Sequence, residues 1–140
     1  MSMAFKCEFT LTDYRETSLR YVARLGNPDW LVVTGTMKTP TTQWTFADEC
    51  WQRQDLKHLA KFFRPHKLPA IGTTLDFLEP CTRFVLADVE DDYAWIECGF
   101  NYECQPPGLP FDTWWSTKLR VPLSDLESIH KELSEACKRV

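Results

Sequence analysis

The chain has 140 residues, of which 44% are hydrophobic and 14% aromatic, and it carries a formal net charge of −4. This composition excludes a disordered chain, and the acidic balance argues against non-specific nucleic-acid binding, which needs a basic face. The sequence shows neither an apolar run of the roughly 20 residues that span a bilayer nor the apolar core of a signal peptide, so we expect one cytoplasmic domain over residues 1–140.

The first third of the sequence alternates between apolar and polar residues, a pattern typical of strands with one buried face. It predicts a strand over Ala4–Tyr14, a polar loop over Arg15–Arg20 and a short strand over Tyr21–Leu25. A Gly-Asn-Pro-Asp turn follows, and then two runs, Trp30–Lys38 and Gln43–Cys50, flank a Thr-Pro-Thr turn. Together these two runs predict a hairpin.

The middle of the sequence changes to a helical period. Its apolar residues share one face of a helix predicted over Gln54–Phe63, and an Arg-Pro pair ends the pattern. The linker that follows contains two prolines and a glycine. Strands are then predicted over Leu75–Leu78, Cys81–Val89, Tyr93–Cys104 and, after a proline-rich loop, Trp114–Val121.

The last segment carries the clearest helical pattern. Ser124 and Glu127 have the spacing of a capping box, and the apolar residues from Leu126 to Cys137 form one stripe. All elements together predict an α+β fold, an antiparallel β-sheet or meander of six to eight strands with one mid-chain helix and one C-terminal helix.

Six cysteines stand at positions 7, 50, 81, 98, 104 and 137, without a Cys-x-x-Cys pair. Cys98 and Cys104 would share the apolar face of one strand, where their sulfurs would lie roughly 20 Å apart. That distance is too long for a disulfide or a shared metal ion. We therefore expect buried free cysteines, no metal site and, because no Gly-rich phosphate loop is present, no cofactor.

Four acidic residues, Asp88, Glu90, Asp91 and Asp92, surround the turn between two predicted strands. They lack the glycine and the spacing of an EF-hand loop. A solvated hairpin turn and a docking patch for a basic partner both fit this cluster. A carboxylate pair for acid–base catalysis fits less well, since no second catalytic element stands beside it.

Two adjacent tryptophans, Trp114 and Trp115, begin the last predicted strand. Neighbouring residues in a strand face opposite ways, so one of them points away from the core. Tyr93 and Trp95 also lie opposite the apolar face of their strand. Either a helix covers this outer face, or exposed aromatic side chains mark a site of protein–protein contact or self-association.

The three histidines, His58, His66 and His130, do not have the spacing of metal ligands. An enzyme whose site combines Cys50 or Cys81 with His58 stays open as an alternative, because such pairs meet only in the fold. A small-molecule or peptide-binding β-domain is a further alternative, and it predicts a deep apolar pocket.

Several short motifs follow one another in a recognisable order. They are Pro-Asp-Trp-Leu-Val-Val-Thr-Gly at 28–35, Trp-Thr-Phe-Ala-Asp at 44–48, Asp-Leu-Lys-His-Leu at 55–59, Leu-Asp-Phe-Leu-Glu-Pro at 75–80, Phe-Asn-Tyr-Glu at 100–103 before Pro106-Pro107, and Leu-Ser-Asp-Leu at 123–126. In order and spacing, over about four-fifths of the chain, they resemble the WapI-type immunity proteins, small bacterial proteins associated with polymorphic contact-dependent toxins.

The resemblance implies a β-rich domain that neutralises a cognate toxin by binding it, with no catalysis of its own. Toxins of this kind include RNase-type domains with a basic surface, which an acidic inhibitor would complement. We expect the acidic residues at 88 and 90–92 to contribute electrostatic recognition, and Trp114 or Trp115 to act as an aromatic anchor. No membrane or direct nucleic-acid contact is expected, and a homodimer is left open.

Overall fold

The computed structural model describes residues 5–13 and 16–140. The strands in these residues are β1 (Lys6–Asp13), β2 (Thr17–Leu25), β3 (Trp30–Lys38), β4 (Gln43–Gln52), β5 (Thr74–Leu75), β6 (Thr82–Val89), β7 (Tyr93–Phe100) and β8 (Trp115–Pro122). The helices are α1 (Asp55–Phe62) and α2 (Leu123–Cys137), with short 3-10 helices η1 (Pro65–Lys67) and η2 (Tyr102–Cys104). The α+β fold with a mid-chain and a C-terminal helix is confirmed.

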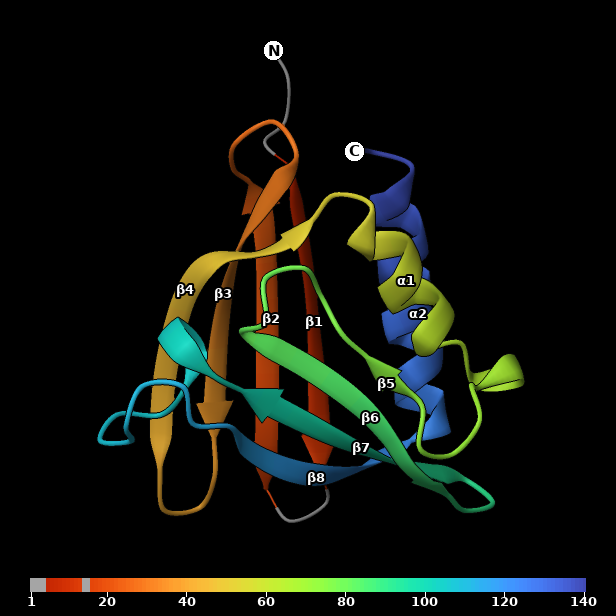
Figure 1. The fold of residues 1–140 in the computed structure, drawn as a ribbon. Coiled ribbons are helices and arrows are strands. Elements are labelled where there is room, and N and C mark those ends of the chain that lie inside the picture. The colour runs from red at the N-terminus through yellow and green to blue at the C-terminus, as the bar shows by residue number, and fades with distance from the viewer. Residues whose placement is uncertain (1–4, 14–15) are drawn as a thin grey trace.

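The strands form two antiparallel sheets, in the order β1-β2-β3-β4 and β5-β6-β7-β8 (Figure 1). The chain leaves the first sheet through α1 and the proline-containing linker, and this interruption divides the meander in two. The strands of the second sheet run across those of the first, α2 lies along β1, and α1 packs against α2 (Figure 1).

One continuous hydrophobic core fills the space between the sheets and the helices. Aromatic rings connect the two sheets, since the ring centroid of Tyr21 lies 5.5 Å from that of Phe84, and that of Phe46 lies 5.5 Å from that of Phe100. Such pairs add to the free energy gained by burying their area. The predicted apolar stripe of the last helix is buried, and the ring of His130 donates a hydrogen bond to the carbonyl of Ala60 in α1 at 2.7 Å.

Two predictions at the N-terminal side need correction. The predicted loop over Arg15–Arg20 is wrong, because β2 already begins at Thr17 and pairs with β1. Its polar residues occupy the exposed face, where Nη2 of Arg20 lies 2.8 Å from Oε1 of Glu8. Ala4, Tyr14 and Arg15, the outer parts of the first predicted strand and loop, lie outside the described residues.

The strand predicted over Tyr93–Cys104 ends at Phe100. Asn101 stops it, because its side-chain oxygen accepts a hydrogen bond from the backbone N–H of Tyr102 at 2.7 Å, and Tyr102 takes a left-handed conformation with φ of 50°. The strand predicted over Leu75–Leu78 is shorter as well, since Phe77 turns into the core against Trp51.

The predicted capping box of the last helix is wrong. The helix begins at Leu123, one residue earlier, and no side chain caps its first turn. The backbone N–H of Leu123 donates instead to the carbonyl of Asp92 at 2.9 Å. This contact joins the start of α2 to the turn between β6 and β7.

Asp13 connects the edges of the two sheets. Its side chain is 1% exposed, and its Oδ2 accepts a hydrogen bond from the backbone N–H of Arg120 in β8 at 2.7 Å. An Asp13→Ala variant leaves that N–H without this acceptor, so we expect the free energy of unfolding to fall by about 1–3 kcal/mol in urea denaturation. Asp76→Ala, at an exposed position, is the control and should change it by less than about 0.5 kcal/mol. Equal effects of the two substitutions would contradict the proposed role of Asp13.

Candidate partner-binding surfaces

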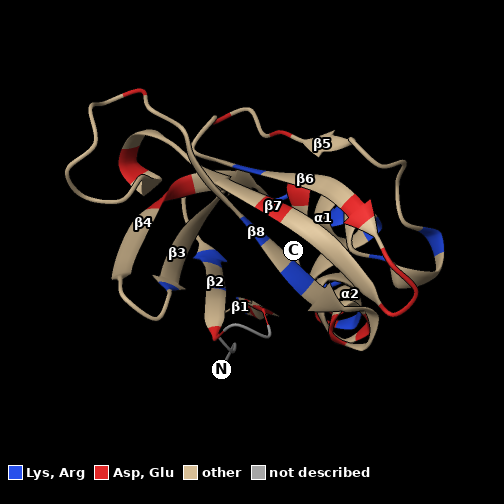
Figure 2. Cartoon of the chain, turned by 90° about the horizontal axis from the view of Figure 1, so that it is seen from below, with Lys and Arg blue, Asp and Glu red and all other residues tan. Residues whose placement is uncertain are grey.

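The outer face of the second sheet has no helix over it in the described part of the chain. The helices pack on each other, on the first sheet and at the ends of β5 and β8, and neither lies in front of β6, β7 and β8 in Figure 2. Of the two arrangements that the sequence left open for this face, helix cover is therefore wrong. The side chains of Tyr93, Trp95 and Trp114 are half-buried among polar neighbours instead.

Aromatic and arginine side chains pair on this outer face. The guanidinium of Arg83 lies 4.1 Å from the ring centroid of Trp114, and that of Arg120 lies 3.9 Å from the ring centroid of Tyr93. Such cation–π contacts hold both side chains flat against the sheet. Trp, Tyr and Arg are the residue types that contribute most of the binding energy in protein interfaces.

A glycine makes room for one of these pairs. Gly99 lies opposite Arg83 in the register of β6 and β7. A Cβ atom at Gly99 would lie 3.0 Å from Cγ and 3.1 Å from Nε of Arg83. The missing side chain therefore lets Arg83 lie across the sheet towards Trp114.

The predicted acidic cluster lies at one edge of this face, at the turn between β6 and β7. Glu90 accepts hydrogen bonds from Nε1 of Trp95 at 2.8 Å and from Nη2 of Arg120 at 3.0 Å. The Trp95 hydrogen bond first, and then that of Arg120, lower the pKa of Glu90, which keeps it ionised. Asp88 caps the backbone N–H of its neighbour Val89 at 2.8 Å.

The remaining two acids of the cluster, Asp91 and Asp92, are exposed at the tip of the turn. The β-bulge between Leu86 and Asp88 changes the direction of the strand just before this tip. The structure thus places Glu90 within the network of the outer face and the two aspartates at its rim.

The two adjacent tryptophans have different surroundings. Trp115 faces inward, where its ring lies 4.9 Å from that of Trp44 and 6.2 Å from that of Phe100, measured between centroids. Trp114 lies on the outer face under Arg83. Of the two residues predicted as an anchor, Trp114 has the position that a partner can reach.

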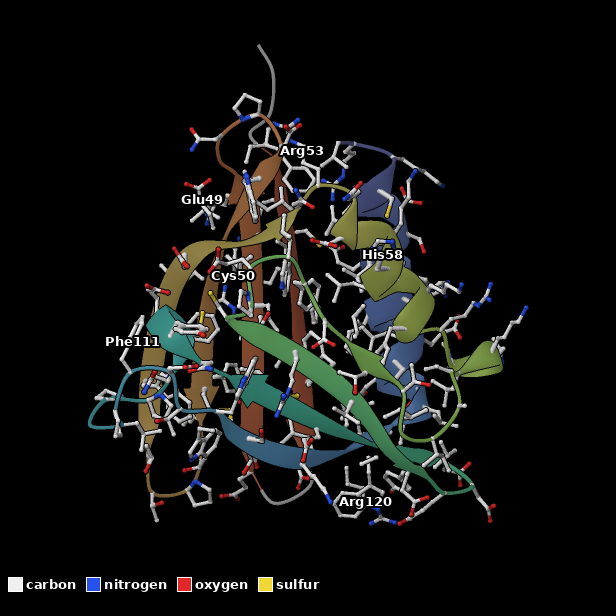
Figure 3. All side chains as sticks on the ribbon, in the orientation of Figure 1. Glu49, Cys50, Arg53, His58, Phe111 and Arg120 are labelled. Carbon is white, nitrogen blue, oxygen red and sulfur yellow. The ribbon has the colours of Figure 1, made fainter. Side chains whose placement is uncertain are left out.

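A second acidic surface was missed by the sequence analysis. It is a cleft of about 390 Å³ lined by Asn27, Trp30, Asp48, Glu49, Glu79 and Glu103, which we call the acidic cleft. Within it, Nδ2 of Asn27 donates to Oε1 of Glu49 at 3.2 Å, and Figure 3 shows Glu49 at the side of the first sheet. Four separate segments supply its residues, so no periodic pattern indicated it. The one available signal was that three of its four acids, Asp48, Glu79 and Glu103, each belong to one of the motifs shared with the family.

A smaller apolar groove, of about 300 Å³, lies beside α1. Its lining residues are His58, Lys61, Phe62, Arg64, Lys67, Leu68, Pro69, Thr73, Thr74 and Leu75. This volume is at the lower limit of pockets that enclose small ligands. The groove lies at the surface, and the space between the sheets is filled by side chains. The alternative of a small-molecule or peptide-binding domain therefore stays a prediction, with this groove as its candidate site.

The alternative catalytic pair, Cys50 or Cys81 with His58, is not assembled. Nδ1 of His58 lies 3.3 Å from Oδ1 of Asp55, its side chain is 57% exposed, and Figure 3 shows it on α1, apart from Cys50. The hydrogen bond between Cys50 and Cys104, followed by burial, raises the pKa of the Cys50 thiol. An activated nucleophile needs the opposite shift.

In the described part of the chain, no helix is both long and apolar enough to cross a membrane. Neither a comparison with curated proteins nor one with solved structures gives a match. The model of the Immunity protein WapI-like family, however, matches residues 5–140. The chain therefore belongs to the WapI-like immunity protein family.

Proposed function

We propose that this chain is a cytoplasmic immunity protein that neutralises a cognate toxin by binding it directly, without catalysis. Membership of the immunity family supports the role, and the outer face of the second sheet supports the mode of action. That face is not covered by a helix and presents Trp114 with Arg83, and Tyr93 with Arg120. This group of pre-positioned aromatic and arginine side chains is the observation on which the proposal rests.

The acidic turn adds a charged rim to that face. Asp91 and Asp92 are exposed beside the Tyr93–Arg120 pair, at the end of the sheet away from Trp114, and Asp88 and Glu90 extend the negative charge towards the sheet. Exposed acids of this kind accelerate encounter with a basic partner and disfavour wrong partners. A basic nuclease domain is the toxin class that suits them, because a nuclease must bind a polyanion.

Co-expression with the toxin encoded beside this chain tests the proposal. We expect the toxin alone to stop growth, the pair to restore it, and the two proteins to co-purify as one complex. Restored growth without a complex would contradict direct binding. Absence of both results with that toxin would contradict the immunity role.

Substitution of Trp114 should weaken the complex strongly. We expect Trp114→Ala to raise the Kd at least about 30-fold, since a central tryptophan commonly contributes this much to an interface. Titration calorimetry with the purified toxin measures the change.

Asp91→Lys combined with Asp92→Lys should mainly slow association and reduce its dependence on salt.

Charge reversal in the acidic cleft is the matched control for the acidic turn. Glu49→Lys combined with Glu103→Lys introduces the same change of charge at the other acidic surface. We expect this variant to keep an affinity close to that of the unmodified protein. If the cleft variant loses the toxin and the Trp114→Ala variant retains it, the binding surface is assigned wrongly.

Light scattering of the isolated protein checks whether a homodimer occupies the same outer face.

A further inference from the structure

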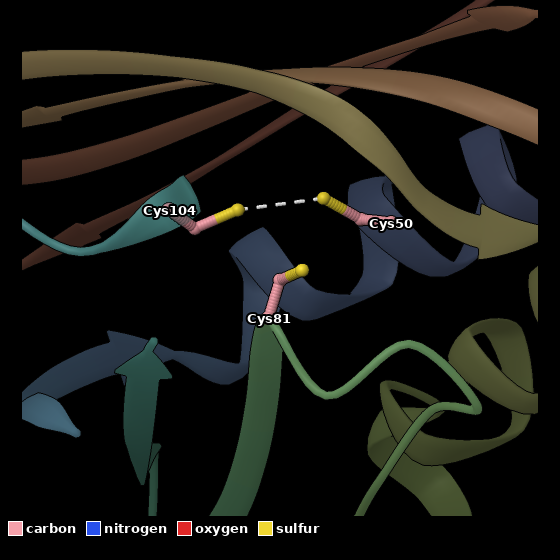
Figure 4. A group of neighbouring side chains, drawn as sticks. All are labelled: Cys50, Cys81 and Cys104. Carbon is pink, nitrogen blue, oxygen red and sulfur yellow. Dashed lines mark hydrogen bonds between the residues drawn. The ribbon is translucent and has the colours of Figure 1, made fainter. Parts of the chain in front are cut away.

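Three cysteines that lie far apart in the sequence meet inside the fold. Cys50 belongs to β4, Cys81 directly precedes β6, and Cys104 ends η2. Their Sγ atoms all lie within 4.8 Å of one another, and those of Cys50 and Cys104 are 3.4 Å apart (Figure 4). All three side chains are fully buried. The sequence spacing of Cys98 and Cys104 gave no indication of this cluster, which we call the thiol cluster.

Backbone hydrogen bonds hold the thiol cluster in place. The N–H of Asn101 donates to the carbonyl of Cys81 at 2.9 Å, and the N–H of Cys104 donates to the carbonyl of Asn101 at 3.0 Å. The indole of Trp44 donates to the carbonyl of Cys104 at 3.3 Å. The left-handed residue Tyr102 turns the chain so that Cys104 points back to the other two thiols. These contacts fix the backbone that carries Cys81 and Cys104.

Carboxylates of the acidic cleft surround one of the three thiols. Sγ of Cys81 lies 3.5 Å from Oδ2 of Asp48, 3.6 Å from Oε1 of Glu79 and 4.0 Å from Oε2 of Glu103. One ligand atom from each of these four residues lies within 4.8 Å of the others. Cys81 therefore connects the buried thiol cluster to carboxylates of the acidic cleft. Cysteines that pack as apolar side chains gain nothing from nearby carboxylates, whereas a bound cation is stabilised by them.

We propose that Cys50, Cys81 and Cys104 bind one Zn²⁺ ion, with Asp48 as the fourth ligand. Tetrahedral Zn²⁺ with Zn–S bonds of about 2.3 Å separates its sulfur ligands by about 3.8 Å, close to the spacing of the thiol cluster. Sulfur donors select Zn²⁺ over Mg²⁺, Ca²⁺ and Mn²⁺, which prefer oxygen ligands. A carboxylate oxygen is an accepted fourth ligand of Zn²⁺.

Binding exchanges protons for the metal ion. Three thiols lose their protons to solvent as three Zn–S bonds form, and the Asp48 carboxylate replaces a water molecule of the ion. The affinity should therefore fall as the pH is lowered. The acidic cleft offers the entry path, because its carboxylates attract a hydrated cation and three of them lie beside Cys81.

A titration with Co²⁺ tests this site directly. The full chain is reduced, treated with a chelator and titrated with Co²⁺, which has visible spectra where Zn²⁺ does not. We expect one equivalent to produce a thiolate-to-cobalt charge-transfer band and the ligand-field bands of tetrahedral Co²⁺. One equivalent of Zn²⁺ should abolish both. Mass spectrometry of the native protein should show one bound Zn²⁺ per chain.

Cysteine variants locate the site. Cys50→Ser, Cys81→Ser or Cys104→Ser should each weaken Zn²⁺ binding by more than about 100-fold, beyond the loss typical of a group that only supports a ligand. Cys98→Ser is the matched control, since Cys98 is equally buried and lies outside the thiol cluster. It should keep the affinity and the spectrum. Asp48→Asn should keep the charge-transfer band, alter the ligand-field bands and weaken binding by about 10-fold.

Several results would overturn the proposal. One is the absence of a charge-transfer band from a protein whose six cysteines, after unfolding, all react with a thiol reagent and are therefore reduced. Others are a band that survives Cys81→Ser, a purely octahedral spectrum from carboxylates, or a Cys50–Cys104 disulfide that forms while Zn²⁺ does not bind. If a serine variant does not fold, the spectrum of the unmodified protein still decides. None of these readouts depends on a toxin.

Discussion

Replacing Trp51 by alanine should lower the free energy of unfolding by about 3–5 kcal/mol, a large part of the total for a domain of this size. Trp51 is fully buried, and its ring centroid lies 5.4 Å from that of Tyr21 and 5.7 Å from that of Phe77. Its indole N–H donates to Oγ1 of Thr82 at 3.1 Å. One side chain of β4 thereby contacts the first sheet, the connection between β5 and β6, and β6 itself.

Urea denaturation followed by circular dichroism measures this change without relying on tryptophan fluorescence. Trp30→Ala is the control, because Trp30 is half-buried at the acidic cleft. A Trp51→Phe variant helps to separate the contributions, since it keeps an aromatic ring and removes the donor to Thr82 together with part of the indole volume. We expect the free energy of unfolding of this variant to fall by about 1–3 kcal/mol. Equal losses for Trp51→Ala and Trp30→Ala would contradict the central place of Trp51.

Substitution of Gly35 should be the second most damaging change. A Cβ atom at this position would lie 2.1 Å from Cζ of Phe46, its register partner on β4. The Phe46 ring cannot move away freely, because it packs against Tyr21 and Phe100 in the core. We expect Gly35→Val to lower the free energy of unfolding by about 3 kcal/mol, at the upper end of the usual loss from overpacking.

A double-mutant cycle checks the cause of that loss. Phe46→Leu alone should destabilise the protein because it removes buried ring area. In its presence, however, Gly35→Ala should be tolerated better than in the unmodified protein, because leucine leaves more room above Gly35. If the two substitutions are additive, contact with the Phe46 ring is not what restricts position 35.

Local periodicity was sufficient to predict much of the fold. The stripe of α2, the β3–β4 hairpin and the acidic turn between β6 and β7 all follow from residues close together in sequence. The failures have local physical causes. Asn101 ends β7 by bonding its own backbone, and the alternation that suggested a strand up to Cys104 carries no sign of that competition. The start of β2 resembled a loop because its outward-facing residues are polar. One of them, Arg20, forms an ion pair with Glu8 of the neighbouring strand.

The candidate sites were predictable only in part. The acidic turn and Trp114 stand out in the sequence, and the structure places them at opposite ends of one uncovered face. The turn adjoins Tyr93, which pairs with Pro122, whereas Trp114 directly precedes the Trp115–Phe100 pair. The partner of Trp114, Arg83, comes from another strand, and its position depends on Gly99. The thiol cluster and the acidic cleft combine segments from both sheets. Such convergence depends on how the two sheets pack, which periodicity along a single strand does not encode.

Titration of the purified toxin's own activity with this protein tests the central claim, neutralisation by direct binding, most directly. We expect inhibition to increase linearly and become complete at one equivalent, with toxin and immunity protein eluting together in size-exclusion chromatography. With the Trp114→Ala variant, complete inhibition of the toxin should require more than one equivalent of this protein. Complete inhibition by far less than one equivalent, with the toxin left chemically altered and no complex formed, would instead show a catalytic mechanism and contradict direct binding.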